Sequence, residues 1–224
     1  MSTAHREQRY AVLLSGRGTT LGALQAAAAD GRLPAPPAMV VSNRADAGGL
    51  ALAREAGLPA RAVRPQDYPD RDSYEAVLAE TIDAGDVHWL ILAGYMRVLG
   101  KAFVRHFHGR MVNIHPSLLP AYRGLDTYRR ALEAGERVHG SSVHFVTEEL
   151  DGGPVIAQAE VEVRPGDTVA SLRARTKARE RKLYPLVLNW LLRERVRMEN
   201  GKVLLDGKVL NGPLRFPADK EISA

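Results

Sequence analysis

The chain has 224 residues, a net charge of +5, 45% hydrophobic and 25% charged residues, and no cysteine. This composition is typical of a globular protein with one sizeable core, and it excludes a disordered or fibrous chain. The absence of cysteine excludes disulfides, thiolate nucleophiles and metal sites with cysteine ligands. The longest apolar run, residues 89–96, is too short to cross a membrane, and residues 1–8 lack a secretory signal. We therefore expect a cytoplasmic protein.

The excess of positive charge lies in the second half of the chain, chiefly in the run RARTKARERK at 173–182. No aromatic residue interrupts this run, so a stacking platform for single-stranded nucleic acid is not predicted. We expect the run to be mainly the solvated face of a helix. The basic half of the chain favours a small phosphorylated or carboxylated ligand over nucleic acid as the partner.

Short apolar runs alternate with helical patterns along the first half of the chain. Strands are predicted at 10–14, 38–42, 60–63, 89–93 and 111–114, and helices at 19–29, 45–56, 71–84 and 101–107. Because these strands are apolar on both faces and alternate with helices, the pattern predicts an α/β fold with a doubly wound, mostly parallel sheet.

The second half continues this fold with a different pattern. Residues 141–146 and 155–163 alternate between apolar and polar side chains, which is typical of mixed or antiparallel edge strands. A long helix is predicted at 168–192, with a kink at Pro185. Residues 195–210 predict small hairpins. No linker divides the chain, so we expect one domain at 9–192 and a short extension, 193–224, packed on it or trailing from it.

The first candidate site is the sequence SGRGTTL at 15–21, which follows the first predicted strand. Glycines let the backbone approach an anion, and the free N–H groups of a helix start attract it. A dinucleotide fingerprint requires a glycine where Leu21 stands, and a triphosphate loop requires a Gly-Lys-Ser/Thr sequence. The segment therefore predicts a site for one terminal phosphate. The alternative is a tight turn capped by its threonines.

The second candidate site is formed by Asn113 and His115 at the end of the fifth predicted strand. Residues two apart on a strand face the same side, and Pro116 holds His115 in an extended conformation. An amide donor beside an imidazole can stabilise an oxyanion and move a proton. The alternative is a structural histidine with satisfied hydrogen bonds.

Four segments of the chain carry a family resemblance. They are SGRGTTL at 15–21, AGYMRVL at 93–99, NIHPSLLPAYRG at 113–124 and HGSSVHFVTEELDGGPVIAQ at 139–158. In this order they resemble the glycinamide ribonucleotide formyltransferase family of purine synthesis, over about residues 10–190. The resemblance implies a Rossmann-like formyltransferase domain and transfer of a formyl group from 10-formyltetrahydrofolate to the primary amine of glycinamide ribonucleotide. It implies small-molecule partners, no metal, no nucleic acid, no membrane, and a monomer or homodimer.

The resemblance also implies roles for individual residues. Asn113, His115 and Asp151 match the family's catalytic residues. The substrate side comprises Gly16, Arg17, Gly18, Thr19, Thr20, Lys177 and Glu180. The folate side comprises Arg71, Met96, Arg97, Val98, Leu99, Asn113, Thr147, Glu148, Glu149, Leu150 and Asp151. The chain departs from the family pattern at Arg17, Thr20, Asp126, Tyr128 and Lys177.

Some of these roles agree with the local pattern, although each has a simpler alternative. Met96, Val98 and Leu99 form an apolar loop that suits a flat pterin, but they would also suit core packing. Glu180 lies at the edge of the apolar helix stripe and is predicted to point inward. Asp151 precedes two glycines, and an isolated Asp-Gly sequence is usually only a turn.

The implied mechanism is direct attack of the substrate amine on the formyl carbon. Asn113 and protonated His115 would stabilise the tetrahedral oxyanion, and Asp151 would favour the charged imidazole. Methionyl-tRNA formyltransferase shares a similar SLLP-x-x-RG stretch but carries a further C-terminal domain, and formyltetrahydrofolate deformylase usually has His where Pro116 stands. A non-catalytic nucleotide-binding module is the alternative of a different class.

Overall fold

The computed structural model describes residues 8–223, and five strands from the first half of the chain form the parallel core of its sheet. They are β1 (Tyr10–Leu14), β2 (Met39–Ser42), β3 (Ala60–Ala62), β4 (Trp89–Leu92) and β5 (Met111–His115). The sheet order in this part is β5-β4-β1-β2-β3, with every pair parallel. The strand order reverses between β1 and β4, and ligands of such sheets bind beyond the carboxyl ends of the strands at this reversal.

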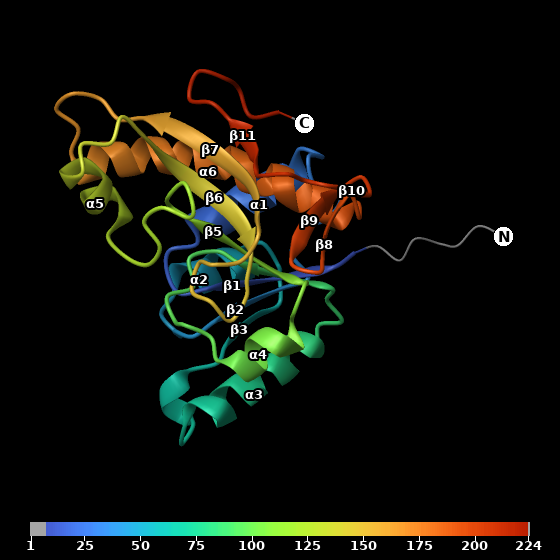
Figure 1. The fold of residues 1–224 in the computed structure, drawn as a ribbon. Helices are drawn as coiled ribbons and strands as arrows, with labels where there is room; N and C mark the ends of the chain where they lie inside the picture. Colours follow the sequence, from blue (N-terminus) through green and yellow to red (C-terminus); the bar gives the residue numbers. More distant parts are fainter. Residues whose placement is uncertain (1–7, 224) are drawn as a thin grey trace.

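Helices cover both faces of the sheet, as the alternating pattern predicts (Figure 1). On one face α1 (Thr19–Ala29), α2 (Gly48–Glu55) and α6 (Val169–Leu192) bury their apolar residues in one large cluster. On the other face α3 (Arg71–Asp83) and α4 (Lys101–His106) form a second cluster. The doubly wound α/β fold is therefore confirmed. A short 3-10 helix at Pro65–Asp67 leads into α3.

The remaining strands extend the sheet beyond β5. The strand β6 (Val138–Phe145) pairs antiparallel with β5, and β7 (Val155–Glu162) pairs antiparallel with β6. The edge strand β11 (Leu214–Phe216) then pairs in parallel with β7. The sequence did not predict β11, because three residues, two half-buried and one exposed, carry no clear periodicity. Its position shows that the C-terminal residues add a strand to the main sheet.

The small hairpins predicted near the C-terminus are also observed. The strands β8 (Val196–Glu199), β9 (Lys202–Leu205) and β10 (Lys208–Val209) form a separate antiparallel sheet. The turn between β8 and β9 is Asn200-Gly201, with φ angles of 48° and 71°. Positive φ at both central residues gives a turn whose twist matches that of the strands, which explains the glycine.

One short helix was not predicted from the sequence, whereas the long helix lies where it was predicted, at 168–192. The helix α5 (Thr127–Glu133) was not predicted, because it is short and begins at Asp126 in a left-handed conformation without a side-chain cap. The long helix α6 begins at a capping box of Thr168 and Ser171, and it continues through Pro185 without ending there. Within residues 8–223, no helix is long and apolar enough to cross a membrane.

Candidate active site

The phosphate-loop candidate lies at the reversal of strand order, between β1 and the start of α1. Gly18 precedes α1 with a φ of 80°, and no side chain caps the helix. The alternative of a turn capped by its threonines is therefore not what the structure contains. The N–H groups of the first helical turn remain available to an anion, and exposed Arg17 lies beside them.

This loop is packed closely against its neighbours. A Cβ atom at Gly18 would lie 2.6 Å from the Cα atom of Gly49, so the loop has no room for a side chain there. The loop also contacts the segment after β4: the N–H of Ser15 donates to the carbonyl of Gly94 at 3.1 Å, and Oγ of Ser15 accepts the N–H of Met96 at 2.8 Å. The predicted phosphate loop therefore lies beside the segment after β4 that carries the folate-side candidates Met96, Arg97, Val98 and Leu99.

Asn113 and His115 lie on one face of β5, beside the antiparallel strand β6. The register places Asn113 opposite His144 and His115 opposite Ser142. Asn113 Nδ2 lies 3.2 Å from Nε2 of His144, and His115 is only 6% exposed. The shared face predicted from the two-residue spacing is thus present, and a second histidine completes it.

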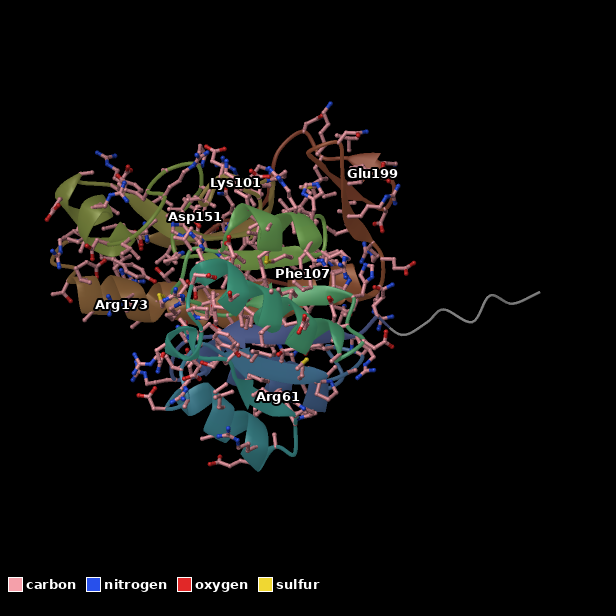
Figure 2. The ribbon with its side chains drawn as sticks, turned by 90° about the horizontal axis from the view of Figure 1, so that it is seen from below. Arg61, Lys101, Phe107, Asp151, Arg173 and Glu199 are labelled. Atoms are coloured by element: carbon pink, nitrogen blue, oxygen red, sulfur yellow. The ribbon has the colours of Figure 1, made fainter. Side chains whose placement is uncertain are left out.

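The loop between β6 and β7 carries Asp151, which is labelled in Figure 2, and its side chain reaches this face. Oδ2 of Asp151 lies 3.4 Å from Nδ1 of His115, and Oδ1 lies 3.8 Å from Nε2 of His144. The same Oδ2 accepts the N–H of Gly124 at 2.9 Å. The Asp-Gly sequence is therefore more than a turn, because its carboxylate contacts both histidines of the cluster.

Sequence reasoning missed His144 as a member of this cluster. Its Nδ1–H donates to the carbonyl of Phe145 at 2.9 Å, which leaves Nε2 as the acceptor for Asn113. Burial lowers the pKa of His144 to about 4, so this imidazole is neutral near pH 7. The alternation of Ser142 and His144 on one strand was the signal, but only the strand register reveals what they face.

The loop after β5 fixes the orientation of His115. Nε2 of His115 lies 2.9 Å from the carbonyl of Tyr122, which places a proton on Nε2 and leaves Nδ1 facing Asp151. The loop itself is held by buried polar side chains: Ser142 Oγ donates to the carbonyl of Ser117 at 2.7 Å, and Gln158 donates to that of Leu119 at 2.8 Å. This frame limits rotation of the imidazole.

Glu180 and Lys177 lie on α6, which packs beside α1 (Figure 1). Glu180 is 2% exposed, so its predicted inward direction is observed. Nζ of Lys177 donates to Oε2 of Glu180 at 2.5 Å, while Oε1 is buried and has no hydrogen-bond partner within residues 8–223. Burial raises the pKa of Glu180. A buried acceptor without a partner is suited to a ligand hydroxyl or amine.

Apart from Arg71 on α3 and Asn113 on β5, the folate-side candidates lie in two loops, after β4 and between β6 and β7, that expose apolar side chains. Met96 and Val98 after β4 are 71% and 64% exposed, and Leu150 in the β6–β7 loop is 54% exposed. The alternative of core packing is thus wrong for Met96 and Val98, whereas Leu99 is half-buried against the second cluster. Exposed apolar side chains gathered beside polar groups are typical of a ligand surface.

The charged residues expected on the folate side already have partners in the protein. Glu148 forms ion pairs with Arg105 and Lys101 of α4, at 2.6 and 3.7 Å, and Glu149 pairs with Arg123. Arg71 contacts Glu75 and the 96–100 segment, and Thr147 makes a long 3.5 Å contact with the carbonyl of Glu149.

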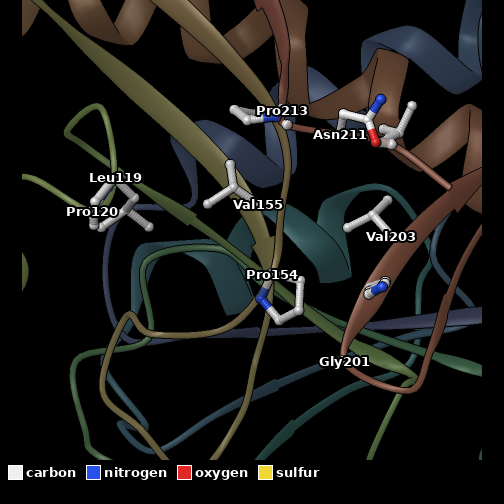
Figure 3. Close-up of a pocket in the computed structure, with 11 residues that line it drawn as sticks. Leu119, Pro120, Pro154, Val155, Gly201, Val203, Asn211 and Pro213 are labelled. Carbon is white, nitrogen blue, oxygen red and sulfur yellow. The ribbon is translucent and has the colours of Figure 1, made fainter.

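A shallow hollow of about 300 Å³ lies elsewhere, between the loop after β5, the start of β7 and the C-terminal strands (Figure 3). Its lining includes Leu119, Pro154, Val203 and Pro213, and none of the predicted site residues. Within residues 8–223, no three His, Asp or Glu side chains lie together in a way that would hold a metal ion.

Comparisons with known proteins agree with this geometry. Residues 8–188 match the family described as formyl transferase. The chain is 44% identical over 209 residues to the phosphoribosylglycinamide formyltransferase of Escherichia coli (strain K12), covering 93% of this chain and 98% of that relative. The solved phosphoribosylglycinamide formyltransferase of Coxiella burnetii superposes with a TM-score of 0.91 at 47% identity, covering 95% of this chain and all of that one.

A solved formyltetrahydrofolate deformylase of Pseudomonas syringae also superposes, with a TM-score of 0.82 at 25% identity. The match covers 90% of this chain but 66% of that one. Identity is therefore much higher, and coverage nearly complete on both sides, for the relatives named for glycinamide ribonucleotide. The chain belongs to the formyl transferase family, and within it to the phosphoribosylglycinamide formyltransferases.

Proposed function

We propose that this protein transfers the formyl group of 10-formyltetrahydrofolate to the primary amine of glycinamide ribonucleotide, a step of purine biosynthesis. Membership of the family supports the reaction class. The observation that carries the assignment of the site is the convergence of Asn113, His115 and Asp151 on one face at the carboxyl end of β5. Catalysis is assigned to these three residues.

The two substrates approach this face along two adjacent loops. The phosphate of glycinamide ribonucleotide binds the 16–20 loop at the start of α1, while Glu180 and Lys177 face the remainder of that substrate. The folate lies against the exposed side chains of Met96, Val98 and Leu150. Because Ser15 bonds to both Gly94 and Met96, the two loops meet close to the end of β5. This arrangement brings the amine and the formyl carbon together at Asn113 and His115.

The chemical step is an attack of the amine nitrogen on the formyl carbon, with the carbonyl electron pair moving to oxygen. Asn113 has a second amide N–H to donate to this oxyanion. Both ring nitrogens of His115 already face Tyr122 and Asp151, so its imidazole acts in the proton transfer beside the oxyanion. The proton lost by the attacking nitrogen passes to the departing folate nitrogen, with the His115–Asp151 pair as the relay through water. The C–N bond to the folate then breaks, giving the N-formyl product and tetrahydrofolate.

The test is a formyl-transfer assay with the purified protein and three acceptors. With glycinamide ribonucleotide, we expect tetrahydrofolate and the N-formyl ribonucleotide to form in equal amounts, measured by absorbance and mass spectrometry. Initiator methionyl-tRNA and water alone are the control acceptors. Preferred formylation of the tRNA, or release of formate without an acceptor, would contradict the proposal. No turnover of any acceptor would favour a non-catalytic binding module.

A further inference from the structure

The donor loop, residues 95–100, has no secondary structure of its own, yet the first turn of α3 holds it at several points. The hydroxyl groups of Tyr74 and Tyr95 are 2.5 Å apart, and the guanidinium of Arg97 lies over the Tyr74 ring at 5.5 Å from its centroid. Nη2 of Arg71 donates to the carbonyl of Val98 at 2.5 Å. The exposed apolar residues of the loop are thus presented by a fixed backbone.

Glu75 is the buried centre of these contacts. It is 7% exposed, and its Oε1 accepts Nε–H of Arg71 at 2.9 Å. Both carboxylate oxygens lie 2.9 Å from the N–H of Gly100, where the donor loop ends and α4 begins. The carboxylate of Glu75 therefore connects the first turns of α3 with the end of the donor loop. It also contacts Arg71, which donates to the carbonyl of Val98. Hydrogen bonds to a charged group are stronger than neutral ones, so the carboxylate of Glu75 holds Arg71 and Gly100 more strongly than a neutral acceptor would.

Gly100 provides an independent sign that this contact sets the local geometry. A Cβ atom at Gly100 would lie 2.5 Å from Oε2 of Glu75 and 3.4 Å from Nε of Arg71. The φ of Gly100 is −71°, which any residue can adopt, so backbone conformation does not require glycine here. The glycine instead leaves the space that the carboxylate of Glu75 occupies, so a side chain at this position would displace that carboxylate.

We propose that Glu75 is a positioning residue for the formyl donor: it fixes the 95–100 loop, through Arg71 and Gly100, in the shape that binds the pterin ring. The inference rests on the proposed function, since it concerns the folate side of that same site. Glu75 does not touch the reacting atoms. Its contacts lie at the Val98 and Gly100 end of the donor loop, whereas the phosphate loop meets this loop at Met96, through Ser15.

The first experiment compares Glu75→Gln with Asp72→Asn in steady-state assays. Asp72 is an exposed acid in the same turn of α3, so both variants lose one negative charge at the same place. In Glu75→Gln one amide oxygen remains as an acceptor, but the charge that pairs with Arg71 is lost and an NH₂ group replaces the second oxygen beside the N–H of Gly100. We expect the KM for 10-formyltetrahydrofolate to rise about tenfold, with kcat and the KM for glycinamide ribonucleotide within about twofold of wild type. Asp72→Asn should match wild type in all three constants.

The second experiment uses a donor that lacks the glutamate tail, a 10-formyl pteroate. Arg71 is a cation at the folate surface, so a defect that arose only from lost attraction to the tail carboxylates would disappear with this donor. If Glu75 shapes the loop for the pterin ring, the increase in KM persists. A defect confined to the full-length donor would therefore overturn the inference.

The third experiment uses Gly100→Ala, which keeps the charge of Glu75 but displaces its carboxylate. We expect the same selective rise in donor KM, and no further rise when Gly100→Ala is combined with Glu75→Ala. Equal losses in both KM values, in kcat and in melting temperature would indicate general unfolding and overturn the inference. A wild-type protein that does not use 10-formyltetrahydrofolate overturns the proposed function itself, whereas an active wild type with an unchanged donor KM in Glu75→Gln overturns this inference alone.

Discussion

The carboxylate of Asp151 lies 3.4 Å from Nδ1 of His115, and the same oxygen accepts the N–H of Gly124 at 2.9 Å. Asp151 comes from the β6–β7 loop, His115 from the end of β5, and Gly124 from the segment before α5. One carboxylate therefore orients the imidazole and holds the chain that follows it. The tetrahedral chemistry proposed for this site depends on that arrangement.

Replacing Asp151 with Asn should lower kcat by about 10²-fold or more, because the side chain keeps its shape but loses the charge that stabilises a protonated imidazole. Asp151 has a φ of 48°, a conformation that asparagine also adopts, so the backbone should be preserved. Steady-state kinetics as a function of pH, with the melting temperature as a check on folding, measure this effect. A near-normal kcat in the Asn variant would remove Asp151 from the mechanism.

Asn113→Ala and His115→Ala should each reduce kcat by about 10²-fold or more, since the first removes a donor to the developing oxyanion and the second removes the imidazole of the proton relay. Asn113 also donates to Nε2 of His144, so its loss leaves a buried acceptor unpaired. Rapid-mixing measurements of a single turnover separate the chemical step from product release. Binding of glycinamide ribonucleotide, measured by calorimetry, should stay within a few-fold of wild type. A single-turnover rate close to that of wild type would refute the catalytic role of the residue concerned.

The buried imidazole of His144 predicts a loss of stability in acid. Its pKa is about 4 in the folded protein against 6.5 for an ordinary histidine, so the unfolded chain binds a proton between these pH values that the folded protein does not. The free energy of unfolding should fall by about 1.4 kcal/mol per pH unit from this group as the pH drops through that window. Above about pH 7 His144 is neutral in both the folded and the unfolded chain, so it no longer changes the free energy of unfolding with pH.

The comparison of His144→Gln with wild type isolates this effect, because His88 and His139, whose pKa values burial also lowers, remain in both proteins. Urea unfolding at pH 7.5 and pH 5 should show a smaller pH dependence in the Gln variant. His108→Gln, at an exposed position, serves as the control. An identical pH dependence in all three proteins would contradict the burial argument.

The phosphate loop is best tested at Gly16 and Arg17. A Gly18 variant would collide with the backbone of Gly49 and unfold the loop, whereas a Cβ at Gly16 meets no protein atom within 4 Å. We expect Gly16→Val to weaken glycinamide ribonucleotide binding by about tenfold or more while the melting temperature and folate binding stay unchanged, because the new side chain occupies only the anion's path. Arg17→Ala should weaken the same binding and reduce its salt dependence. The control variant Arg54→Ala, which removes an exposed arginine of α2, should change neither. Equal weakening of both ligands would argue against a phosphate role.

Glu180→Gln should separate stability from binding. Burial raises the pKa of the Glu180 carboxyl, so the folded protein holds its proton more tightly than the unfolded chain does, and stability falls as the pH rises above about 4.5. Removing the charge should therefore raise the melting temperature at pH 8 while weakening glycinamide ribonucleotide binding. Glu133→Gln, an exposed acid on α5, should change neither. Normal binding of glycinamide ribonucleotide by Glu180→Gln would show that Glu180 has only a structural role.

Local sequence signals were sufficient for the parallel core of the sheet. The strands β1, β2, β4 and β5 are continuous apolar runs, and each is followed by a turn or helix start, so their type follows from hydrophobic pattern alone. The same holds for the turns at Asn200-Gly201 and Asp206-Gly207, whose residues favour positive φ. The short elements α5 and β11 gave no such signal, because their conformation depends on what they pack against.

The sequence by itself determined that Asn113 and His115 share a face, because side chains two apart on a strand must do so. It also determined, through motif resemblance, that Asp151 is a candidate for the same site. Only the tertiary structure decided that His144 belongs there, that Tyr122 fixes the proton on Nε2 of His115, and that Glu75 holds the donor loop. These contacts join residues 7 to 31 positions apart. They depend on strand register and loop packing, which no local pattern of the chain encodes.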